Sequence, residues 1–473
     1  MTELTISLET GSDRPLYEQI YNHIKTEILD GGLPFQERLP STRKLAQYLQ
    51  VSRSTVDMAY EQLLSEGYIE SAPCRGYFVS ELDGIYKGVA KETEEARTVE
   101  VKKEHYRFDF SPNGVDLDSF PHNAWRKLSR VVLQDDEKEL FMLGEPAGEL
   151  ELRSTIAAHL HQSRGVNCLP EQVVVGAGTD YLLMLLQAVF GEKRSIAMEN
   201  PTYKKAYQVL ENLGNSMQVI DMDRSGMNVK KLEASGAEIA YVMPSHQYPL
   251  GTVMPIKRRL ELLKWADGSK ERYIIEDDYD SEFRYKGKPI PALQGYDNHG
   301  KVIYIGTFSK SIAPAIRVSY LVLPEKLLRC YKERGTVFSS TVSRVDQRIV
   351  AGFLKEGYYE RHLNKMRAVY KNRHDVLLEG LKEIPGIEIS GENAGVHLLV
   401  CFQNGRTEGE ACALAKKAGI QVYGLSGYYV REKEETHTVI LGYANLKEEA
   451  IREAVGLLKD VWREKKKSRS TDF

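Results

Sequence analysis

Residues 302–323 read VIYIGTFSKSIAPAIRVSYLVL, in which two apolar, β-like runs flank hydroxyl side chains, a lysine and an arginine. Similar apolar runs recur at 173–175, 239–243 and 273–275, and helical segments separate them from Arg107 onward. This alternation predicts an α/β fold, with a mostly parallel sheet covered by helices on both faces.

Lys310 lies close to the end of the predicted strand 302–305, and Arg317 follows seven residues later. Open α/β sheets bind ligands at the ends of their strands. The amine of a lysine there is able to form a Schiff base with an aldehyde, while hydroxyl groups and an arginine hold a phosphate dianion. Because a lone lysine is more often simply solvated, Lys310 by itself does not decide between these interpretations.

Two further strand ends favour a cofactor pocket. The acidic stretch 276–280, EDDYD, follows the run 273–275, and the turn 176–179, GAGT, follows 173–175 and opens a predicted helix. A carboxylate would keep a pyridine nitrogen protonated, and the amides of the turn would form a phosphate nest. The plainer alternatives are a solvated acidic loop and a tight turn with a threonine cap. The succession of all three features along the chain favours the pocket.

Composition excludes several classes of protein. The chain has 473 residues, 42% hydrophobic and 28% charged, and its net charge of −3 gives no global field for nucleic acid or membranes. Its five cysteines are scattered without a Cys-x-x-Cys pair, which argues against a disulfide framework or a zinc site. No signal peptide and no apolar stretch of about 20 residues is visible. We therefore expect a cytoplasmic protein with no metal and no membrane partner.

The first 80 residues have a different pattern, of three helices followed by a two-stranded ribbon. Apolar residues recur at helical spacing from Leu16 to Ile28, and Ser41 and Ser52 are placed to cap two further helices. Two short helices joined by a tight turn suit a helix-turn-helix. The side chains that would face DNA are Arg43, Arg53, Ser54, Thr55 and Arg75, with Gly76 at the ribbon tip. Seven Lys or Arg residues against eleven Asp or Glu give this region a net charge of −4, so a three-helix core with solvated arginines is the alternative.

Composition also predicts the domain boundaries. We expect an N-terminal domain over 1–80, a charged linker with almost no large apolar residues over 81–106, and a second domain over 107–465. Glycine-rich turns and short strands predict a smaller α+β lobe from about Ile384 onward.

The strings PLYEQIYNHIKTEIL at 15–29 and ERLPSTRKLAQYLQVSRSTVDMAYEQLLSEGYIES at 37–71 resemble the GntR-type winged-helix domain, over residues 14–80. The resemblance implies DNA binding, with contacts from Arg43, Arg53, Thr55 and Gly76.

The strings GEPAGELELRSTIAAHLHQSRGV, VVGAGTDYLLMLL, MENPTY, PSHQYPLGTVMP, IIEDDYDSEF and GTFSKSIAPAIRVSYLVLP resemble fold type I pyridoxal-phosphate enzymes of the aspartate aminotransferase group, over about 107–465. The resemblance implies that Lys310 carries the aldimine of pyridoxal 5′-phosphate and that Asp277 pairs with the ring nitrogen. It also implies that Tyr279 contacts the ring hydroxyl and that Tyr203 stacks on the ring. The implied phosphate contacts are Gly178, Thr179, Thr307, Ser309 and Arg317.

Together the two halves resemble the MocR subfamily of GntR regulators, in which an aminotransferase-like domain senses ligands through its cofactor. We therefore expect a homodimeric regulator, not an enzyme, that binds double-stranded DNA at paired half-sites. Its effector would be a small amine or amino acid, or pyridoxal phosphate itself, and its targets genes of amino acid or vitamin B6 metabolism. An active aminotransferase that also binds DNA, and a DNA-binding dimer with an inert enzyme-like domain, are the alternatives.

The chain departs from the aminotransferase pattern in ways that bear on the effector. The string that usually contains Asn-Pro-Thr-Gly reads QYPLG at 247–251, and the strand 438–443 lacks the arginine that clamps a substrate carboxylate. GABA-responsive members of the subfamily carry arginines at the positions of Lys205 and Gly427, which argues against GABA as the effector. Lys205 and the nearby loop residue Arg431 are the candidate effector contacts.

Overall fold

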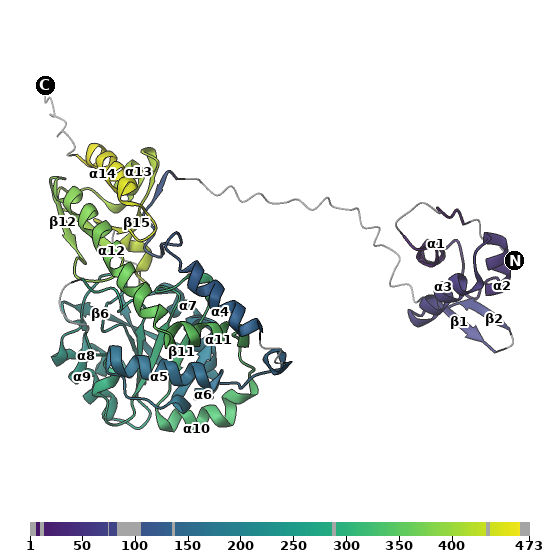
Figure 1. The fold of residues 1–473 in the computed structure, drawn as a ribbon, viewed down its shortest axis with the longest axis horizontal. Helices are drawn as coiled ribbons and strands as arrows, with labels where there is room; N and C mark the ends of the chain where they lie inside the picture. Colours follow the sequence, from purple (N-terminus) through teal and green to yellow (C-terminus); the bar gives the residue numbers. More distant parts are fainter. Residues whose placement is uncertain are drawn as a thin grey trace. The chain divides into compact units, whose positions relative to one another are not determined.

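The computed structural model describes residues 6–9, 14–73, 75–82, 106–134, 138–285, 290–431 and 436–463. The chain divides into two compact units, 1–103 and 104–473 (Figure 1). Most of the predicted linker, from 83 to 105, lies outside the described residues, as does Cys74.

The N-terminal unit is a winged helix-turn-helix, as the sequence predicts. Its elements are α1 (Leu16–Leu29), α2 (Thr42–Leu49), α3 (Arg53–Ser65), β1 (Ile69–Ala72) and β2 (Gly76–Val79), the two strands pairing antiparallel. Both predicted helix caps are confirmed, because Ser41 Oγ accepts from the Lys44 amide and Ser52 Oγ accepts from the Thr55 amide. Apolar side chains from all three helices and both strands form one core.

A mixed, mostly parallel sheet of eight strands forms the centre of the second unit, in the order β4-β11-β10-β9-β8-β5-β6-β7. Strand β11 runs antiparallel to both of its neighbours, β4 and β10. The strands are β4 (Val173–Gly176), β5 (Ser195–Asn200), β6 (Ser216–Asp223), β7 (Gly226–Met227), β8 (Ile239–Val242), β9 (Tyr273–Asp278), β10 (Val302–Thr307) and β11 (Ser319–Val322). The predicted α/β architecture is confirmed.

Helices cover both faces of this sheet (Figure 1). Apolar residues of α5 and α11–α12 pack on one face together with α8 and α9, and those of α6, α7 and α10 pack on the other. The helices are α4 (His122–Gln134), α5 (Leu150–Arg164), α6 (Thr179–Phe190), α7 (Lys204–Asn212), α8 (Val229–Ala234), α9 (Ile256–Asp267), α10 (Glu325–Arg334), α11 (Arg344–Lys355) and α12 (Tyr358–Lys382).

A smaller lobe follows α12. It contains an antiparallel sheet of β12 (Ile387–Ser390), β13 (His397–Phe402), β16 (Thr438–Gly442) and β15 (Tyr423–Gly424), with helices α13 (Glu408–Lys417) and α14 (Glu448–Trp462). Strand β14 (Ile420–Gln421) of this region pairs with β3 (Phe108–Asp109), so the start of the second unit joins its C-terminal lobe.

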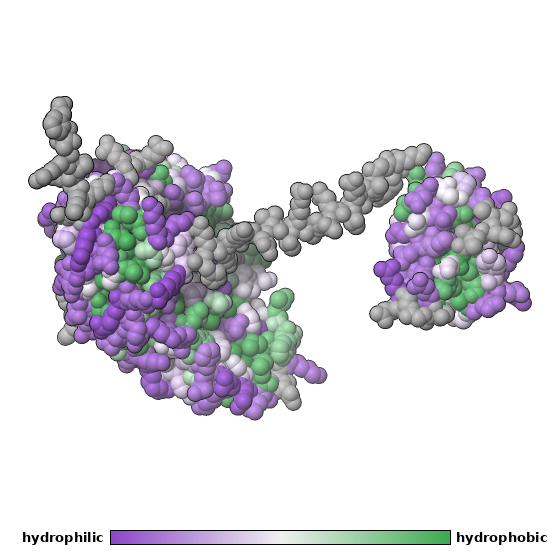
Figure 2. All heavy atoms as spheres, turned by 90° about the horizontal axis from the view of Figure 1, so that it is seen from above, coloured by the Kyte–Doolittle hydropathy of each residue, from purple (hydrophilic) through white to green (hydrophobic). Residues whose placement is uncertain are grey.

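Hydrophilic side chains cover much of the visible surface, with apolar areas between them (Figure 2). Among the described residues, the consecutive side chains Phe141, Met142 and Leu143 are strongly exposed, at 76%, 65% and 89%. No helix within the described residues is long and apolar enough to cross a bilayer.

Candidate functional site

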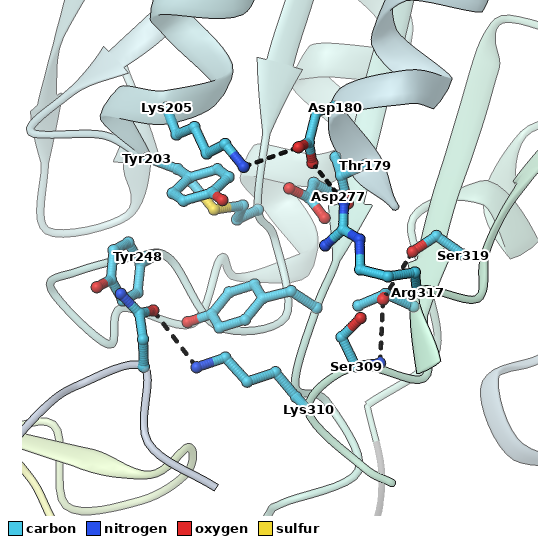
Figure 3. A pocket seen from close by; sticks show the side chains of 14 residues that line it. Thr179, Asp180, Tyr203, Lys205, Tyr248, Asp277, Ser309, Lys310, Arg317 and Ser319 are labelled. Atoms are coloured by element: carbon cyan, nitrogen blue, oxygen red, sulfur yellow. Dashed lines mark hydrogen bonds and ion pairs between the residues drawn. The ribbon is translucent and has the colours of Figure 1, made fainter. Parts of the chain in front are cut away.

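One pocket of the second unit gathers nearly all of the side chains predicted to hold a cofactor (Figure 3). It lies at the C-terminal ends of β9 and β10, beside the N-terminus of α6. Its lining residues are Asn113, Thr179, Asp180, Tyr203, Lys205, Met243, Tyr248, Asp277, Tyr279, Thr307, Ser309, Lys310, Arg317 and Ser319. Of the predicted cofactor residues only Gly178 is not in this lining, and it directly precedes Thr179.

Lys310 extends into the pocket from the loop that follows β10 (Figure 3). Its Nζ donates to the Pro112 carbonyl at 3.3 Å and to Asn113 Oδ1 at 3.4 Å. Desolvation lowers the pKa of Lys310 to about 8. At pH 7 roughly one amine in ten is then uncharged, compared with fewer than one in a thousand at an ordinary lysine pKa near 10.4. The side chain is therefore well suited to act as a nucleophile toward an aldehyde.

The acidic stretch is part of a buried strand, which excludes the solvated-loop interpretation. Strand β9 continues to Asp278, and Glu276, Asp277 and Asp278 are 0%, 4% and 6% exposed. Each carboxylate has partners: Glu276 accepts from the Leu293 and Gln294 amides, and Asp278 accepts from Arg164 at 2.8 Å. Since side chains alternate along a strand, Asp277 alone of the three faces the pocket.

Asp277 is a buried carboxylate, and no cation of the described residues forms an ion pair with it. It accepts a hydrogen bond from the Tyr241 hydroxyl. Desolvation raises the pKa of Asp277 to about 7. A protonated ring nitrogen placed opposite would restore the ionised carboxylate, so the site fits a pyridine better than a neutral apolar group.

The N-terminus of α6 and Arg317 form a cradle for an anion. Arg317 Nη2 donates to the Ala177 carbonyl at 3.1 Å and pairs with Asp180 Oδ1 at 3.2 Å. Gly178 precedes the helix at a φ of +92°, and a Cβ there would lie only 2.0 Å from Arg317 Nη2. The glycine thus leaves the space that the guanidinium occupies over the helix N-terminus, where backbone N–H groups favour an anion.

Hydroxyl groups complete the opposite side of this cradle. Thr307 Oγ1 accepts from the Ser309 amide at 3.1 Å and from Ser319 Oγ at 2.8 Å. Ser319 was not predicted from the sequence; it reaches the site because β11 pairs with β10 at the register Thr307–Ser319. Together these groups have the chemistry to bind a phosphate dianion.

Three tyrosines form the aromatic wall of the pocket. The ring of Tyr248 lies 6.0 Å from that of Tyr203 and 5.7 Å from that of Tyr279, both edge-on. The Tyr279 hydroxyl lies 2.9 Å from His246 Nδ1, which also contacts Asp280. Tyr248 was not predicted as a site residue, although it belongs to the divergent QYPLG string.

The two candidate effector contacts lie in different hollows. Lys205 lines the pocket and its Nζ donates to Asp180 Oδ2 at 2.7 Å (Figure 3). Although burial acts to raise the pKa of Asp180, the ion pairs with Lys205 and Arg317 lower it. Arg431 instead lines a separate hollow with Asn200, Leu250, Thr252 and Tyr429, among others. Nothing in this geometry brings Lys205 and Arg431 onto one ligand.

The predicted DNA contacts lie on three parts of the N-terminal unit: the first turn of α2, the first turn of α3 and the ribbon tip between β1 and β2. Arg43, Arg53, Ser54 and Arg75 are exposed. Arg53 Nε lies 3.4 Å from Asp57 Oδ2, and because both groups are exposed this ion pair leaves the arginine available to a phosphate.

The remaining two predicted contacts, Thr55 and Gly76, have structural roles in the N-terminal unit. Thr55 Oγ1 lies 2.8 Å from Ser52 Oγ within the helix cap. Gly76 begins β2 at a φ of +107°, a conformation that favours glycine.

Two family descriptions match the chain, one for each unit. Residues 16–79 match "Bacterial regulatory proteins, gntR family", and residues 109–458 match "Aminotransferase class I and II". Together they cover most of the described residues in both units.

Individual relatives agree with this division. The chain is 40% identical over 465 residues to the uncharacterized HTH-type transcriptional regulator YdeL of Bacillus subtilis (strain 168), covering 98% of this chain and 100% of that protein. It is 31% identical over 471 residues to the probable rhizopine catabolism regulatory protein MocR of Rhizobium meliloti, covering 96% of this chain and 95% of that protein.

Among solved structures, kynurenine aminotransferase of Pyrococcus horikoshii in complex with PMP matches with a TM-score of 0.66 and 25% identity, covering 75% of this chain and 90% of that one. The regulator relatives extend over both units, whereas the aminotransferase corresponds to three quarters of the chain. The chain therefore belongs to the MocR subfamily of GntR-type transcriptional regulators, which join a winged-helix domain to an aminotransferase-like domain.

Proposed function

We propose that this regulator binds pyridoxal 5′-phosphate at Lys310 and uses the loaded pocket to sense a small amine, such as an amino acid, or the cofactor itself. The observation that carries the proposal is the convergence, in one pocket, of an amine of lowered pKa, a buried carboxylate and an anion cradle. When bound, the cofactor supplies an aldehyde that condenses reversibly with primary amines. The related Pyrococcus structure, described as a complex with PMP, supports the same choice of cofactor.

Each part of the pocket has one task in this proposal. Asp277 provides a negative charge for the ring nitrogen, and the cradle around Arg317 binds the phosphate through the α6 N-terminus and hydroxyl groups. The Lys310 amine lies near Asn113. Because its pKa is lowered to about 8, removing its proton before it reacts with the aldehyde costs little free energy. Tyr203 and Tyr279 would lie on either side of the pyridine ring of the cofactor.

A regulator is favoured over an enzyme by the binding groups that the pocket lacks. Strand β16 (Thr438–Gly442) carries no arginine to clamp a substrate carboxylate. Besides Lys310 and Arg317, which the proposal assigns to the cofactor, the cation among the described lining residues is Lys205, and it already forms an ion pair with Asp180. An effector is thus held mainly by its amine, which suits reversible sensing better than turnover. The enzyme alternative is supported by the likeness to aminotransferases.

We propose further that the N-terminal domain spans 1–80, that 81–106 is a linker, and that the domain over 107–465 forms a homodimer. The exposed apolar run Phe141–Leu143 supports a subunit interface, because large contiguous apolar surfaces usually bind a partner. Two tethered winged helices would then read paired half-sites by avidity, with base and phosphate contacts from the N-terminus of α3.

Three measurements on the purified chain test the proposal. Incubation with pyridoxal phosphate should give a visible absorption band, and borohydride reduction should add the cofactor's mass to the peptide that contains Lys310. Fluorescence anisotropy on a duplex from the chain's own promoter should then report a change in DNA affinity with cofactor or with one member of an amino acid panel. An unmodified Lys310 peptide would contradict cofactor binding, and an unchanged DNA affinity would contradict sensing. Many turnovers with an amino donor and a 2-oxo acid would favour the enzyme.

A further inference from the structure

A second cavity lies on the opposite face of the central sheet from the Lys310 pocket. It has a volume of about 480 Å³, within the ordinary range for small-molecule sites, and shares no lining residue with that pocket. Residues of α5, of α12 and of the loop after β9 line it, together with Tyr304 and Tyr320.

The alternation of side chains along the strands separates the two sites. On β11, Ser319 lines the Lys310 pocket whereas its neighbour Tyr320 lines the second cavity. On β9, Asp277 faces the first pocket, and Asp278 accepts from Arg164 and Tyr304 at the second. The cavity is therefore a separate site and not an extension of the cofactor pocket.

Three buried polar atoms at this cavity have no hydrogen-bond partner among the described residues. They are Arg284 Nε, Arg284 Nη1 and Glu282 Oε2. Buried donors and acceptors are nearly always satisfied in folded proteins, because an unsatisfied one loses its bonds to water without replacement. Two unsatisfied donors and one unsatisfied acceptor beside the same cavity thus point to a ligand that supplies both kinds of partner.

The other charged groups of the cavity are already engaged. Arg164 donates to Asp278 at 2.8 Å and to Ser245 at 2.6 Å. Arg367 donates to the Glu282 carbonyl at 2.8 Å and to Asn364 at 2.9 Å. Arg164 and Arg367 therefore already have hydrogen-bond partners, and the unsatisfied atoms of the cavity belong to Arg284 and Glu282.

The charges of the lining are balanced. Arg164 is neutralised by Asp278. The other two arginines of the lining, Arg284 and Arg367, are equalled in number by the carboxylates Glu282 and Glu360, of which Glu360 lies 3.5 Å from His159 Nδ1. A simple anion or a simple cation would leave one charge of the unsatisfied pair without a partner. A neutral molecule with separated opposite charges satisfies both.

We propose that this cavity binds a small zwitterion that carries a carboxylate and a protonated amine, as free amino acids do. Because the three unsatisfied atoms are closed off from the cavity as the side chains now lie, Arg284 and Glu282 turn toward it on binding: the carboxylate then accepts from the Arg284 N–H groups, and the amine donates to Glu282 Oε2. Burial raises the pKa of Glu282 to about 7, and an ammonium group beside Oε2 would favour the ionised carboxylate. Since the two sites share no lining residue, this proposal does not require a cofactor in the Lys310 pocket.

The test uses a probe that cannot react at Lys310. N,N-dimethylglycine and N,N-dimethyl-L-leucine keep a carboxylate and one N–H donor, but a tertiary amine forms no imine with an aldehyde. Titration calorimetry on the full chain should show saturable binding of at least one of them. Acetate, which lacks the cation, and trimethylglycine, which lacks the N–H, should bind at least tenfold more weakly.

Variants locate the binding site. Arg284→Gln and Glu282→Gln should each weaken binding at least tenfold, whereas Lys310→Ala should leave it within twofold of the parent. Arg329→Gln, which removes an exposed arginine of α10, is the matched control. Since Arg284 leaves two buried donors unpaired, its replacement should not lower the thermal midpoint; if that variant nevertheless fails to fold, Glu282→Gln decides.

Two results would overturn the proposal. One is the absence of saturable binding of both dimethyl probes to the folded parent chain. The other is binding that Arg284→Gln and Glu282→Gln leave unchanged, or that Lys310→Ala abolishes, since either would place the probe elsewhere.

Discussion

Replacing Gly178 with alanine should weaken cofactor binding by disturbing Arg317 while leaving the fold intact. The new Cβ would lie 2.0 Å from Arg317 Nη2, so the guanidinium has to leave its place over the N-terminus of α6. Losing one hydrogen bond between charged groups costs about 1.5–3 kcal/mol. This corresponds to an increase in the Kd for pyridoxal phosphate of roughly 10- to 100-fold.

Backbone strain has to be separated from this steric effect, because Gly178 also has a φ of +92°. Gly236 has a φ of +69°, and no atom of the described residues lies within 4 Å of a Cβ built there. Alanine in the left-handed region costs roughly 1–2 kcal/mol of stability. Gly178, at a φ of 92° and a ψ of 164°, instead lies in a region that almost only glycine adopts, where the cost is about 1–3 kcal/mol. Gly236→Ala is therefore a control for alanine at a positive φ without a displaced arginine.

The measurement is an absorbance titration of cofactor-free protein with pyridoxal phosphate, alongside thermal unfolding of both variants. We expect both variants to lose thermal stability, Gly178→Ala at least as much as Gly236→Ala, and a weaker cofactor affinity in Gly178→Ala alone. The reasoning is refuted if Gly178→Ala binds the cofactor as the parent does, or if Gly236→Ala loses affinity to the same extent.

Three further predictions concern stability, DNA binding and pH. Asp116→Ala leaves Arg373 without its buried carboxylate partner, now 3.0 Å away, and should cost about 3–5 kcal/mol in urea unfolding; a loss below about 1 kcal/mol would contradict this. Arg43→Ala should reduce the slope of the logarithm of the DNA association constant against the logarithm of the salt concentration by about 0.9, the value for one phosphate contact. An unchanged slope would show that Arg43 does not contact a phosphate. Because burial raises the pKa of Asp277 to about 7, ionising it opposes folding, so cofactor-free protein should lose stability as pH rises from 5 to 8. Asp277→Asn should make that decline smaller but not abolish it, because burial also raises the pKa of Glu199, Glu276 and Glu282 to about 7. An equal loss of stability with pH in variant and parent would show that Asp277 does not contribute.

Local patterns were sufficient to predict the fold class and most of the elements near the site. The caps at Ser41 and Ser52 and the apolar runs of β4, β8 and β10 depend on short stretches of chain, so their sequences report them directly. Strand β9 was predicted too short because its last three residues are acidic. Their burial depends on partners such as Arg164, which lies more than a hundred positions earlier in the chain.

Long-range pairing explains what the sequence did not predict. Strand β3 pairs with β14 across some three hundred residues, and only two residues on each side take part. In the pocket, Asn113, Tyr248 and Ser319 come from three separate segments, and the residue type of each gave no indication of its place in the site. The glycine turn and the lysine string, in contrast, carry their chemistry within a few consecutive residues.

At the second cavity, too, residues distant in the sequence share hydrogen bonds. Tyr359, on α12, lies 3.2 Å from Glu282 Oε1 and 3.0 Å from Ser311 Oγ, and Ser311 directly follows Lys310. A phenol has one proton, so Tyr359 donates to only one of these acceptors at a time, and an ionised carboxylate is the stronger of the two. A ligand that keeps Glu282 ionised therefore draws this proton away from Ser311. The hydrogen bond that Ser311 accepts from Tyr359 thus depends on the charge of Glu282, and neither the stretch around Ser311 nor the one around Glu282 reveals this by itself.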